Sequence, residues 1–382
     1  MKKTVAIIGG NLRNKGAWMM ADVLISEFIV KNEDSFYFFT PFSEDLKPLK
    51  NKYINDNLKD TIIWSPKNIL ISFLLVHIPI LRQRNKIIKT INNCDYVYDI
   101  SGISFAESRG VKHLIYNIIS IYIPSYLKTK IIKFPQSFGP IDSKIYKFIT
   151  KSSLKKCETI FSRGNSSSKT LESLKITHNN STDLLFCKNQ FQEVKDEELI
   201  IISPSIIVAN KLAKKGVDYV NELKIFVEFL QKNKYKIIII PNSVSKNKHK
   251  NVFDDSVLCE EIYNAVSSKN NLSLIKNDLS IEEIYELYKK PIIVVTSRFH
   301  SMILALNSGS FPIVMGWNHK YNEIMEEFNL SQYSINLDSK LSKSLIAQFN
   351  SLVNSYPSLM EGRKELLSDH KIKTNLIFKE LS

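Results

Sequence analysis

The chain has 382 residues, enough for two compact domains and a short further segment. Hydrophobic residues make up 44% and charged residues 24%, which is ordinary for a globular protein and excludes a largely disordered chain. The net charge of +14 would suit an anionic partner, but the lysines are dispersed along a chain that is also rich in Ile and Asn. This dispersal argues against a nucleic-acid-binding protein, whose cations would be clustered and interleaved with aromatic residues.

The cysteines and histidines give no sign of a disulfide framework or a metal site. The four cysteines lie far apart and form no CxxC pair, as in reduced proteins of the cytosol. The seven histidines show no HExxH or similar ligand spacing. The N-terminal apolar run ends at Gly9, too early for a signal peptide. We therefore expect a cytoplasmic protein that uses no metal.

The first half of the chain alternates predicted strands and helices. We expect strands at 4–8, 35–39, 61–64, 95–100, 130–134 and 159–162, and helices at 16–30, from about 111, at 143–157 and at 167–174. Apolar strands between amphipathic helices predict a parallel sheet covered on both faces. The polar stretch 188–198 has no apolar period, so we expect a first domain over 1–187.

The apolar segment 69–81 is followed by Arg82, Arg84 and Lys86. As one helix it would span roughly 20 Å, less than the ~30 Å hydrocarbon core of a bilayer. Two interpretations stay open. The segment is either a buried core helix or a peripheral contact with the inner face of a membrane.

The second half repeats the alternation. We expect strands at 199–202, 236–240, 272–275, 291–296 and 311–315, and helices at 217–232, from about 255, at 281–288 and after His300. Ser280 and Glu283 have the spacing of a capping box. This pattern predicts a second domain over 188–355 and a helical segment over 356–382. The fold class is thus α/β, with two doubly wound, Rossmann-like domains facing across a cleft and ligands at the carboxyl ends of the strands.

The most informative turn is Ser297-Arg298-Phe299-His300-Ser301, between an apolar strand and a helix that ends before Gly309. The free N–H groups of a helix N-terminus attract anions, Arg matches phosphate or carboxylate, and His exchanges protons near neutral pH. An anionic substrate and a proton transfer are the functional hypothesis. The alternative is that Arg298 pairs with a structural carboxylate and His300 caps the helix.

Other polar turns also follow predicted strands. They are the Gly- and Asn-rich 9–17, Asp99 to Phe105, Gln136 to Pro140, and Ser162-Arg163. Gln and Ser side chains suit sugar hydroxyls or phosphate. Each turn has a structural alternative: a simple tight turn for 9–17, and a solvated charge for Arg163.

In their order and spacing, these turns resemble the polysaccharide pyruvyl transferase family. The resemblance runs from Ile7 to about Leu330, and its further pieces are Asp183 to Phe186, Gly309, Pro312 and Lys320. It implies a fold similar to the B-type (GT-B) glycosyltransferases. It also implies transfer of the carboxyvinyl unit of phosphoenolpyruvate to a sugar of a surface polysaccharide or a lipid-linked precursor, with release of phosphate and no cofactor.

The resemblance also implies which residues form the site. Arg298 and His300 match the donor-site Arg and His and are the expected catalytic residues, with phosphoenolpyruvate on the second domain and the acceptor on the first. The expected substrate-binding residues are Arg163, Ser297, Ser301, Asn14, Gly16, Gly102, Ser104, Gln136, Ser137 and Lys320. The chain departs from the family pattern at Trp18, Ile103 and Gly164. A glycosyltransferase or epimerase that uses a nucleotide sugar is the alternative function.

Overall fold

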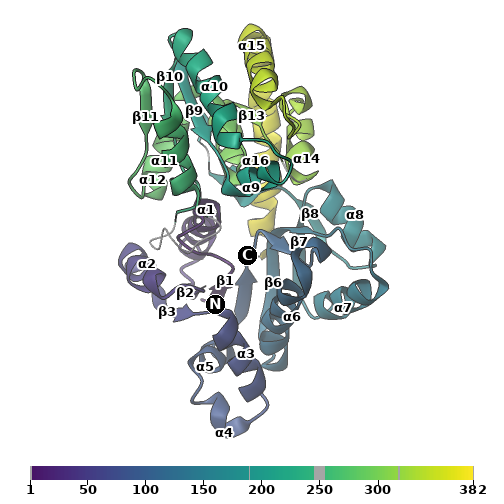
Figure 1. The fold of residues 1–382 in the computed structure, drawn as a ribbon. Coiled ribbons are helices and arrows are strands. Elements are labelled where there is room, and N and C mark those ends of the chain that lie inside the picture. The colour runs from purple at the N-terminus through teal and green to yellow at the C-terminus, as the bar shows by residue number, and fades with distance from the viewer. Residues whose placement is uncertain (1, 189, 245–253, 317–318, 382) are drawn as a thin grey trace. The chain divides into compact units, whose positions relative to one another are not determined.

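The structure is a computed structural model that describes residues 2–188, 190–244, 254–316 and 319–381. The chain forms two compact units (Figure 1). Unit 1 comprises Met1–Leu12, Ala17–Cys187 and Lys373–Ser382, and unit 2 comprises Arg13–Gly16 and Lys188–Ile372. The chain therefore passes between the units more than once. In particular, the short segment 13–16 after the first strand belongs to unit 2.

Unit 1 is built on a parallel sheet with the strand order β3-β2-β1-β4-β6-β7-β8, and β5 pairs with β6. The strands are β1 (Thr4–Ile8), β2 (Ser35–Thr40), β3 (Leu58–Ile63), β4 (Tyr96–Asp99), β5 (Ile103–Ser104), β6 (Lys130–Phe138), β7 (Thr159–Arg163) and β8 (Asn179–Ser181). The order reverses between β1 and β4, which makes their carboxyl ends the expected ligand edge of this sheet.

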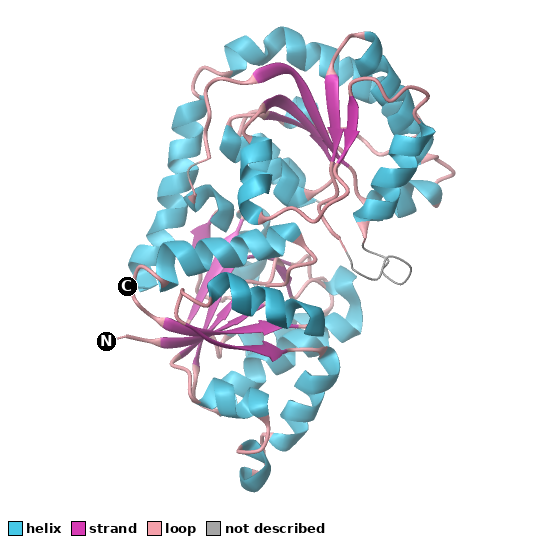
Figure 2. Cartoon of the chain, turned by 90° about the vertical axis from the view of Figure 1, so that its left-hand side faces the viewer, coloured by secondary structure: helices cyan, strands magenta, loops and turns pink. Residues whose placement is uncertain are grey.

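Helices cover both faces of the unit 1 sheet (Figure 2). They are α1 (Lys15–Leu24), α2 (Leu46–Tyr53), α3 (Pro66–Leu75), α4 (Pro79–Arg82), α5 (Lys86–Asn92), α6 (Gly110–Tyr126), α7 (Lys144–Leu154) and α8 (Asn165–Ser173). Two apolar clusters fill the interior, one around Phe39 and Trp64 and the other around Phe105 and Phe138. Burial of apolar side chains on both faces explains why the strands are apolar throughout.

Unit 2 repeats this construction on a smaller parallel sheet with the order β11-β10-β9-β12-β13. Its strands are β9 (Asp196–Ser203), β10 (Lys236–Ile239), β11 (Leu272–Leu274), β12 (Pro291–Thr296) and β13 (Phe311–Val314). Its helices are α9 (Ile206–Ala213), α10 (Tyr219–Lys232), α11 (Asp255–Ala265), α12 (Ile281–Tyr288), α13 (Phe299–Ser308), α14 (His319–Glu327), α15 (Leu341–Leu359) and α16 (Arg363–Leu381). The last residues of α16 belong to unit 1.

The predicted parallel α/β architecture is confirmed, and several elements differ in extent. β6 continues to Phe138, so Gln136 and Ser137 lie in the strand and not in a turn after it. The segment 69–81 is not one helix, because α3 ends at Leu75 and α4 starts only at Pro79. Helix α9, which begins after the N-cap Ser205, was not predicted.

Local signals fix the elements around the β12–α13 turn. Every residue of β12 is buried, as its run of Ile and Val predicts. The Ser280–Glu283 capping box at the start of α12 is present. α13 ends at Gly309, whose backbone is left-handed with φ 88° and ψ 7°, a conformation that favours glycine. The sequence therefore predicts the strand and the helix on either side of this turn with boundaries correct to within one residue.

Among the described residues, no helix combines the length and the apolar character that crossing a bilayer requires.

Candidate active site

The turn between β12 and α13 lies where the strand order of the unit 2 sheet reverses. β12 pairs with β9 on one side and with β13 on the other, while β10 and β11 extend the sheet beyond β9. In open parallel sheets, ligands bind outside the carboxyl ends of the strands at such a switch point. Ser297 to Ser301 therefore occupy the position where this class of fold binds its ligands.

Arg298 is the N-cap residue of α13, and its guanidinium pairs with Asp255 at the start of α11. The Arg298 side chain is 12% exposed, whereas that of Asp255 is fully buried. Burial raises the pKa of Asp255, and the charge of Arg298 opposes that rise. Arg298 therefore pairs with a carboxylate, as the alternative interpretation of the sequence predicted. The pair also holds the guanidinium at the N-terminal end of α13.

Asp255, itself the first residue of α11, connects the N-termini of α11 and α9 to this site. Its Oδ1 accepts the N–H of Ile206, the first residue of α9, at 3.1 Å, and its Oδ2 accepts the N–H of Ser243 at 2.9 Å. Helices α9, α11 and α13 follow β9, β10 and β12, so all three begin at the carboxyl edge of the sheet. Their N-terminal dipoles make this edge favourable for negative charge.

His300 lies in the first turn of α13 and packs against the 13–16 segment. It is 8% exposed, and its ring stands edge-on to Phe299. A Cβ on Gly16 would lie 1.9 Å from His300 Nδ1 and 2.1 Å from Cγ, so only glycine fits at this position. Asn14 Oδ1 accepts the N–H of Gly16 at 3.1 Å and so supports the start of α1. The structure therefore brings Gly16 to His300 and ties Asn14 to Gly16.

Lys15 holds the 13–16 segment in place from the other side. Its ammonium pairs with Asp278 and donates to the carbonyl oxygen of Leu279 at 3.0 Å, and its N–H donates to the carbonyl oxygen of Asn242 at 3.1 Å. These bonds tie the residues before Gly16 to the loops after β10 and β11. The close approach of Gly16 to His300 is thus set by several contacts.

Lys320, in the first turn of α14, also reaches the β12–α13 turn. Its Nζ lies 4.4 Å from the centre of the Phe299 ring, a cation–π contact next to both Arg298 and His300. The predicted grouping of Lys320 with the turn is therefore seen in the structure. Two cationic side chains, one imidazole and a helix N-terminus meet here.

Neighbouring helices engage the hydroxyls of Ser297 and Ser301. Both are fully buried, and their hydroxyls are hydrogen-bonded to Tyr219 at 3.1 Å and to Tyr288 at 2.7 Å. Tyr321 also donates to the carbonyl oxygen of Ser297 at 3.0 Å. These hydroxyls tie the turn to its neighbouring helices, and a contact of either serine with a substrate stays a prediction.

The polar residues of unit 1 meet at the carboxyl edge of its own sheet. Arg163, 3% exposed at the end of β7, donates from Nη1 to Asp183 at 2.7 Å and from Nη2 to the carbonyl oxygen of Gly102 at 2.7 Å and Ser137 Oγ at 3.3 Å. Arg163 is therefore an internal tie, not a solvated charge. A contact of Arg163 with a substrate stays a prediction.

A buried ion pair lies deeper under the same edge. Lys133 Nζ donates to Asp99 Oδ2 at 2.6 Å and contacts Ser104 Oγ at 3.4 Å, and neither charged side chain is more than 3% exposed. Burial by itself would raise the pKa of Asp99, but Lys133 and Ser101 outweigh it and hold the pKa below its usual value. Gln136 donates to the carbonyl oxygen of Asp99 at 2.6 Å, while its own Oε1 is buried and has no hydrogen-bond partner among the described residues.

Three residues hold these sites, and of these Asp255 and Lys133 were not expected from the sequence. Asp255 and Asp183 each pair with a predicted arginine, and Lys133 pairs with Asp99. Lys133 had a signal, because a charged residue inside the apolar run of β6 must be paired when buried. Asp255 is an ordinary residue near a helix start in the sequence, Asp183 belongs to the family resemblance, and only the fold shows that each pairs with an arginine. Across the described ranges, His, Cys, Asp and Glu form no group of three that could hold a metal ion.

Comparison with known proteins places the chain in a family. The sequence profile of the family "Polysaccharide pyruvyl transferase" matches residues 22–319. The chain belongs to this family. As a polysaccharide pyruvyl transferase family member it is a transferase, and the matched stretch contains Arg163, Arg298 and His300. Asn14 and Gly16 lie ahead of the matched stretch.

One relative is consistent with this assignment, and several solved structures show the fold. The amylovoran biosynthesis protein AmsJ of Erwinia amylovora is 20% identical over 124 residues, which are 32% of this chain and 30% of that protein. The chain thus spans less than a third of the length of this relative. The fold of the present chain is that of the GT-B proteins. UDP-GlcNAc 2-epimerases from Neisseria meningitidis and Methanocaldococcus jannaschii both have TM-scores of 0.60, with 12% and 14% identity, and each comparison covers 100% of this chain and 99% of the other. A glycosyltransferase from Rickettsia africae has a TM-score of 0.58, with 14% identity and coverage of 99% and 96%.

Proposed function

We propose that this transferase moves the carboxyvinyl unit of phosphoenolpyruvate onto a glycan and releases phosphate. The observation that carries the proposal is the β12–α13 turn, where Arg298, His300 and Lys320 come together at the carboxyl edge of the unit 2 sheet. Membership of the pyruvyl transferase family supports the type of reaction. Unit 1 is proposed to hold the acceptor, because its sheet presents polar side chains at the corresponding edge.

Phosphoenolpyruvate carries a phosphate and a carboxylate, and the unit 2 site suits both. Helix N-termini favour anions there, and Lys320 and Arg298 are the cationic side chains of the turn, with the charge of Arg298 partly offset by Asp255. Asp255 holds Arg298 from one side, so the guanidinium is positioned before the donor binds. A pre-positioned cation loses less conformational entropy on binding than a mobile one.

The reaction needs a proton at one end of the donor and the loss of protons from the acceptor. In ketal formation, the methylene carbon takes up a proton, two sugar hydroxyls form bonds to C2, and the bond from C2 to the phosphate oxygen breaks. The two hydroxyls lose two protons. One balances the proton gained by the methyl group, and the other leaves with phosphate. His300 is the proposed proton-transfer group, a role worth typically 10²–10⁴-fold in rate.

Calorimetry tests the donor. We expect phosphoenolpyruvate to bind in the presence of a chelator, because the proposed site uses side chains and helix N-termini and needs no metal. A UDP-sugar is the matched competitor, since nucleotide-sugar enzymes share the fold. Binding of the UDP-sugar with no heat from phosphoenolpyruvate would replace this proposal with the glycosyltransferase or epimerase function.

Phosphate release tests the reaction. The protein is mixed with phosphoenolpyruvate and a panel of free and lipid-linked glycans, and phosphate is measured with and without each acceptor. We expect release that depends on the acceptor. Proton NMR of the product then distinguishes a ketal, which has a new methyl group, from an enol ether, which keeps the methylene.

A further inference from the structure

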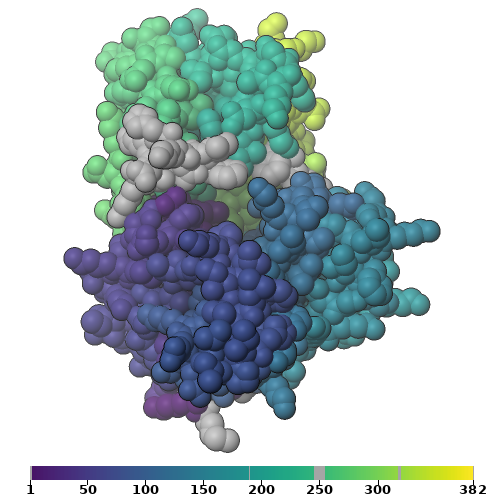
Figure 3. Space-filling view, turned by 60° about the horizontal axis from the view of Figure 1, so that its bottom comes forward, coloured from purple at the N-terminus to yellow at the C-terminus, as the bar shows by residue number. Residues whose placement is uncertain are grey.

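One end of unit 1 exposes a row of large aliphatic side chains. In α3, Ile69, Ser72 and the following Val76 are buried, whereas the opposite side of the helix is exposed. The exposed residues, which we name the α3–α4 face, are Leu70 (50% exposed), Ile71 (40%), Leu74 (61%), Ile78 (45%) and Ile80 (74%). α4 buries none of its residues. Figure 3 shows this end of the unit toward the viewer, in blue.

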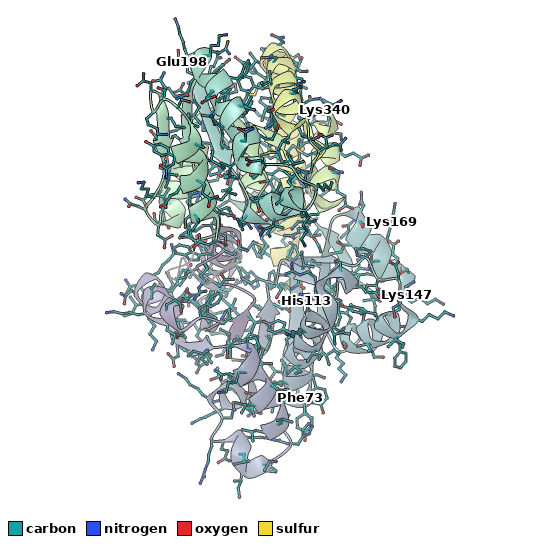
Figure 4. The ribbon with its side chains drawn as sticks, in the orientation of Figure 1. Phe73, His113, Lys147, Lys169, Glu198 and Lys340 are labelled. Carbon is teal, nitrogen blue, oxygen red and sulfur yellow. The ribbon has the colours of Figure 1, made fainter. Side chains whose placement is uncertain are left out.

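Aromatic side chains lie directly beside this face. Phe73 on α3, labelled in Figure 4, packs edge-on against Tyr122 of α6, with ring centres 5.2 Å apart. His77 packs against Tyr126 at 4.8 Å, and Arg82 lies over the Tyr126 ring and donates to its hydroxyl at 2.9 Å. Tyr side chains with cationic neighbours are typical of segments at a membrane–water interface.

The segment that carries the α3–α4 face has only basic charged residues. Residues 61–94 contain five Lys or Arg and no Asp or Glu. Lys86 pairs with Asp60, but within the described residues no carboxylate pairs with Lys67, Arg84 or Lys89. The face therefore combines apolar side chains with uncompensated positive charge.

We propose that the α3–α4 face docks on a bilayer surface that contains anionic lipid. Helix α3 has ten residues and is about 15 Å long, which suits a helix that lies in the plane of the interface. The aliphatic side chains enter the boundary between headgroups and acyl chains, and the basic residues contact the lipid phosphates. A second copy of the chain is the poorer partner, because it would bring a like-charged surface to this one.

This proposal develops one of the two interpretations that the sequence left open for 69–81. The structure shows that only one side of α3 belongs to the core, and Pro79 separates α4 from it. A core helix would bury both sides. The proposal does not depend on the reaction, so a failure of the donor assays leaves it unaffected.

Vesicle flotation of the full chain tests the docking. Vesicles of phosphatidylcholine with about one third phosphatidylglycerol are compared with phosphatidylcholine alone, at about 0.02 M and about 0.5 M salt. We expect the protein to float with the anionic vesicles at low salt and to be released as salt rises. A protein that stays unbound from anionic vesicles at low salt, or that binds both compositions equally, overturns the proposal.

Variants locate the binding surface. The double variant Leu74→Asp with Ile80→Asp should lower vesicle binding at least tenfold, and Lys67→Ser with Arg84→Ser should lower it and flatten its salt dependence. Val194→Asp is the control, because Val194 is 78% exposed but lies next to Glu193 in unit 2 and should bind as wild type. Thermal unfolding checks that each variant is folded.

Two further outcomes also count against the proposal. If Leu74→Asp with Ile80→Asp binds like wild type, while the same changes at Ile145 and Phe148 on α7 abolish binding, the docking face lies elsewhere. Those two residues are 73% and 72% exposed and so provide a matched comparison. If sedimentation shows a wild-type dimer that the Leu74→Asp with Ile80→Asp variant loses, and no vesicle binding is seen, the face is a contact between copies.

Discussion

Replacing Gly16 with Ala is the sharpest test of the unit 2 site, because it adds a single methyl group next to the proposed proton-transfer residue. The added Cβ would lie 1.9 Å from His300 Nδ1 and 2.7 Å from His300 Cβ. Non-bonded carbon contacts settle at about 3.5 Å or more, so the imidazole must move by about 1.6 Å. A misplacement of roughly 1 Å in a reacting group can cost about 10²-fold in rate. We therefore expect turnover to fall about a hundredfold.

The same substitution should leave the fold largely intact. Gly16 is the second residue of α1, and Ala favours a helix over Gly by up to about 1 kcal/mol. Overpacking costs about 1–3 kcal/mol and acts in the opposite direction. The free energy of unfolding should therefore fall by no more than about 3 kcal/mol. A denaturant titration measures it.

The assay is acceptor-dependent phosphate release, with kcat and KM determined separately. Because the ring of His300 moves while Arg298 keeps its partner Asp255, kcat should fall more than the affinity for phosphoenolpyruvate. Gly216→Ala is the control, since a Cβ there meets no heavy atom within 4 Å. Because Gly216 has a positive φ of 73°, replacing it with Ala should also lower the stability of the protein slightly. The rate of this control variant then shows how much a loss of stability by itself lowers turnover.

A double-variant cycle shows whether Gly16 acts through His300. If it does, Gly16→Ala should have little further effect in a protein that already carries His300→Ala. Two results would refute the reasoning. One is a folded Gly16→Ala variant with wild-type kcat, and the other is a pair of losses that simply add.

Three further predictions follow, two for the unit 2 site and one for His113 in unit 1. His300→Ala should lower turnover by roughly 10²–10⁴-fold with less effect on donor binding, whereas Arg298→Ala should weaken calorimetric binding of phosphoenolpyruvate and Arg298→Lys should restore it only in part. Asp255→Ala leaves a mostly buried guanidinium without its carboxylate and should cost about 3–5 kcal/mol in a urea titration, whereas a change below about 1 kcal/mol would show that the pair is unimportant. Burial, with Arg109 and Lys133 nearby, lowers the pKa of His113 to about 4. The unfolded chain then binds more protons between about pH 4 and 6.5, so stability should fall as pH falls through this window, and His113→Gln should remove that part of the pH dependence.

The sequence alone determined the elements around the unit 2 site. The apolar run of β12, the capping box of α12 and Gly309 after α13 are signals that act over a few residues, and each gave the right boundary. Arg298 and His300 are two residues apart, so any helix that begins there brings both to the same end of α13. Their place at the carboxyl edge follows from the alternation of parallel strands and helices.

The tertiary structure decided which side chains hold those residues and which are buried. Asp255 pairs with Arg298, and Gly16 approaches His300, across long stretches of chain that no local pattern connects. Ser297 and Ser301 follow the same turn pattern as a ligand site, yet two tyrosines from other helices bury their hydroxyls. The physical reason is that propensity and capping act between near neighbours. Burial and the pairing of charges depend instead on which surfaces the completed fold brings together.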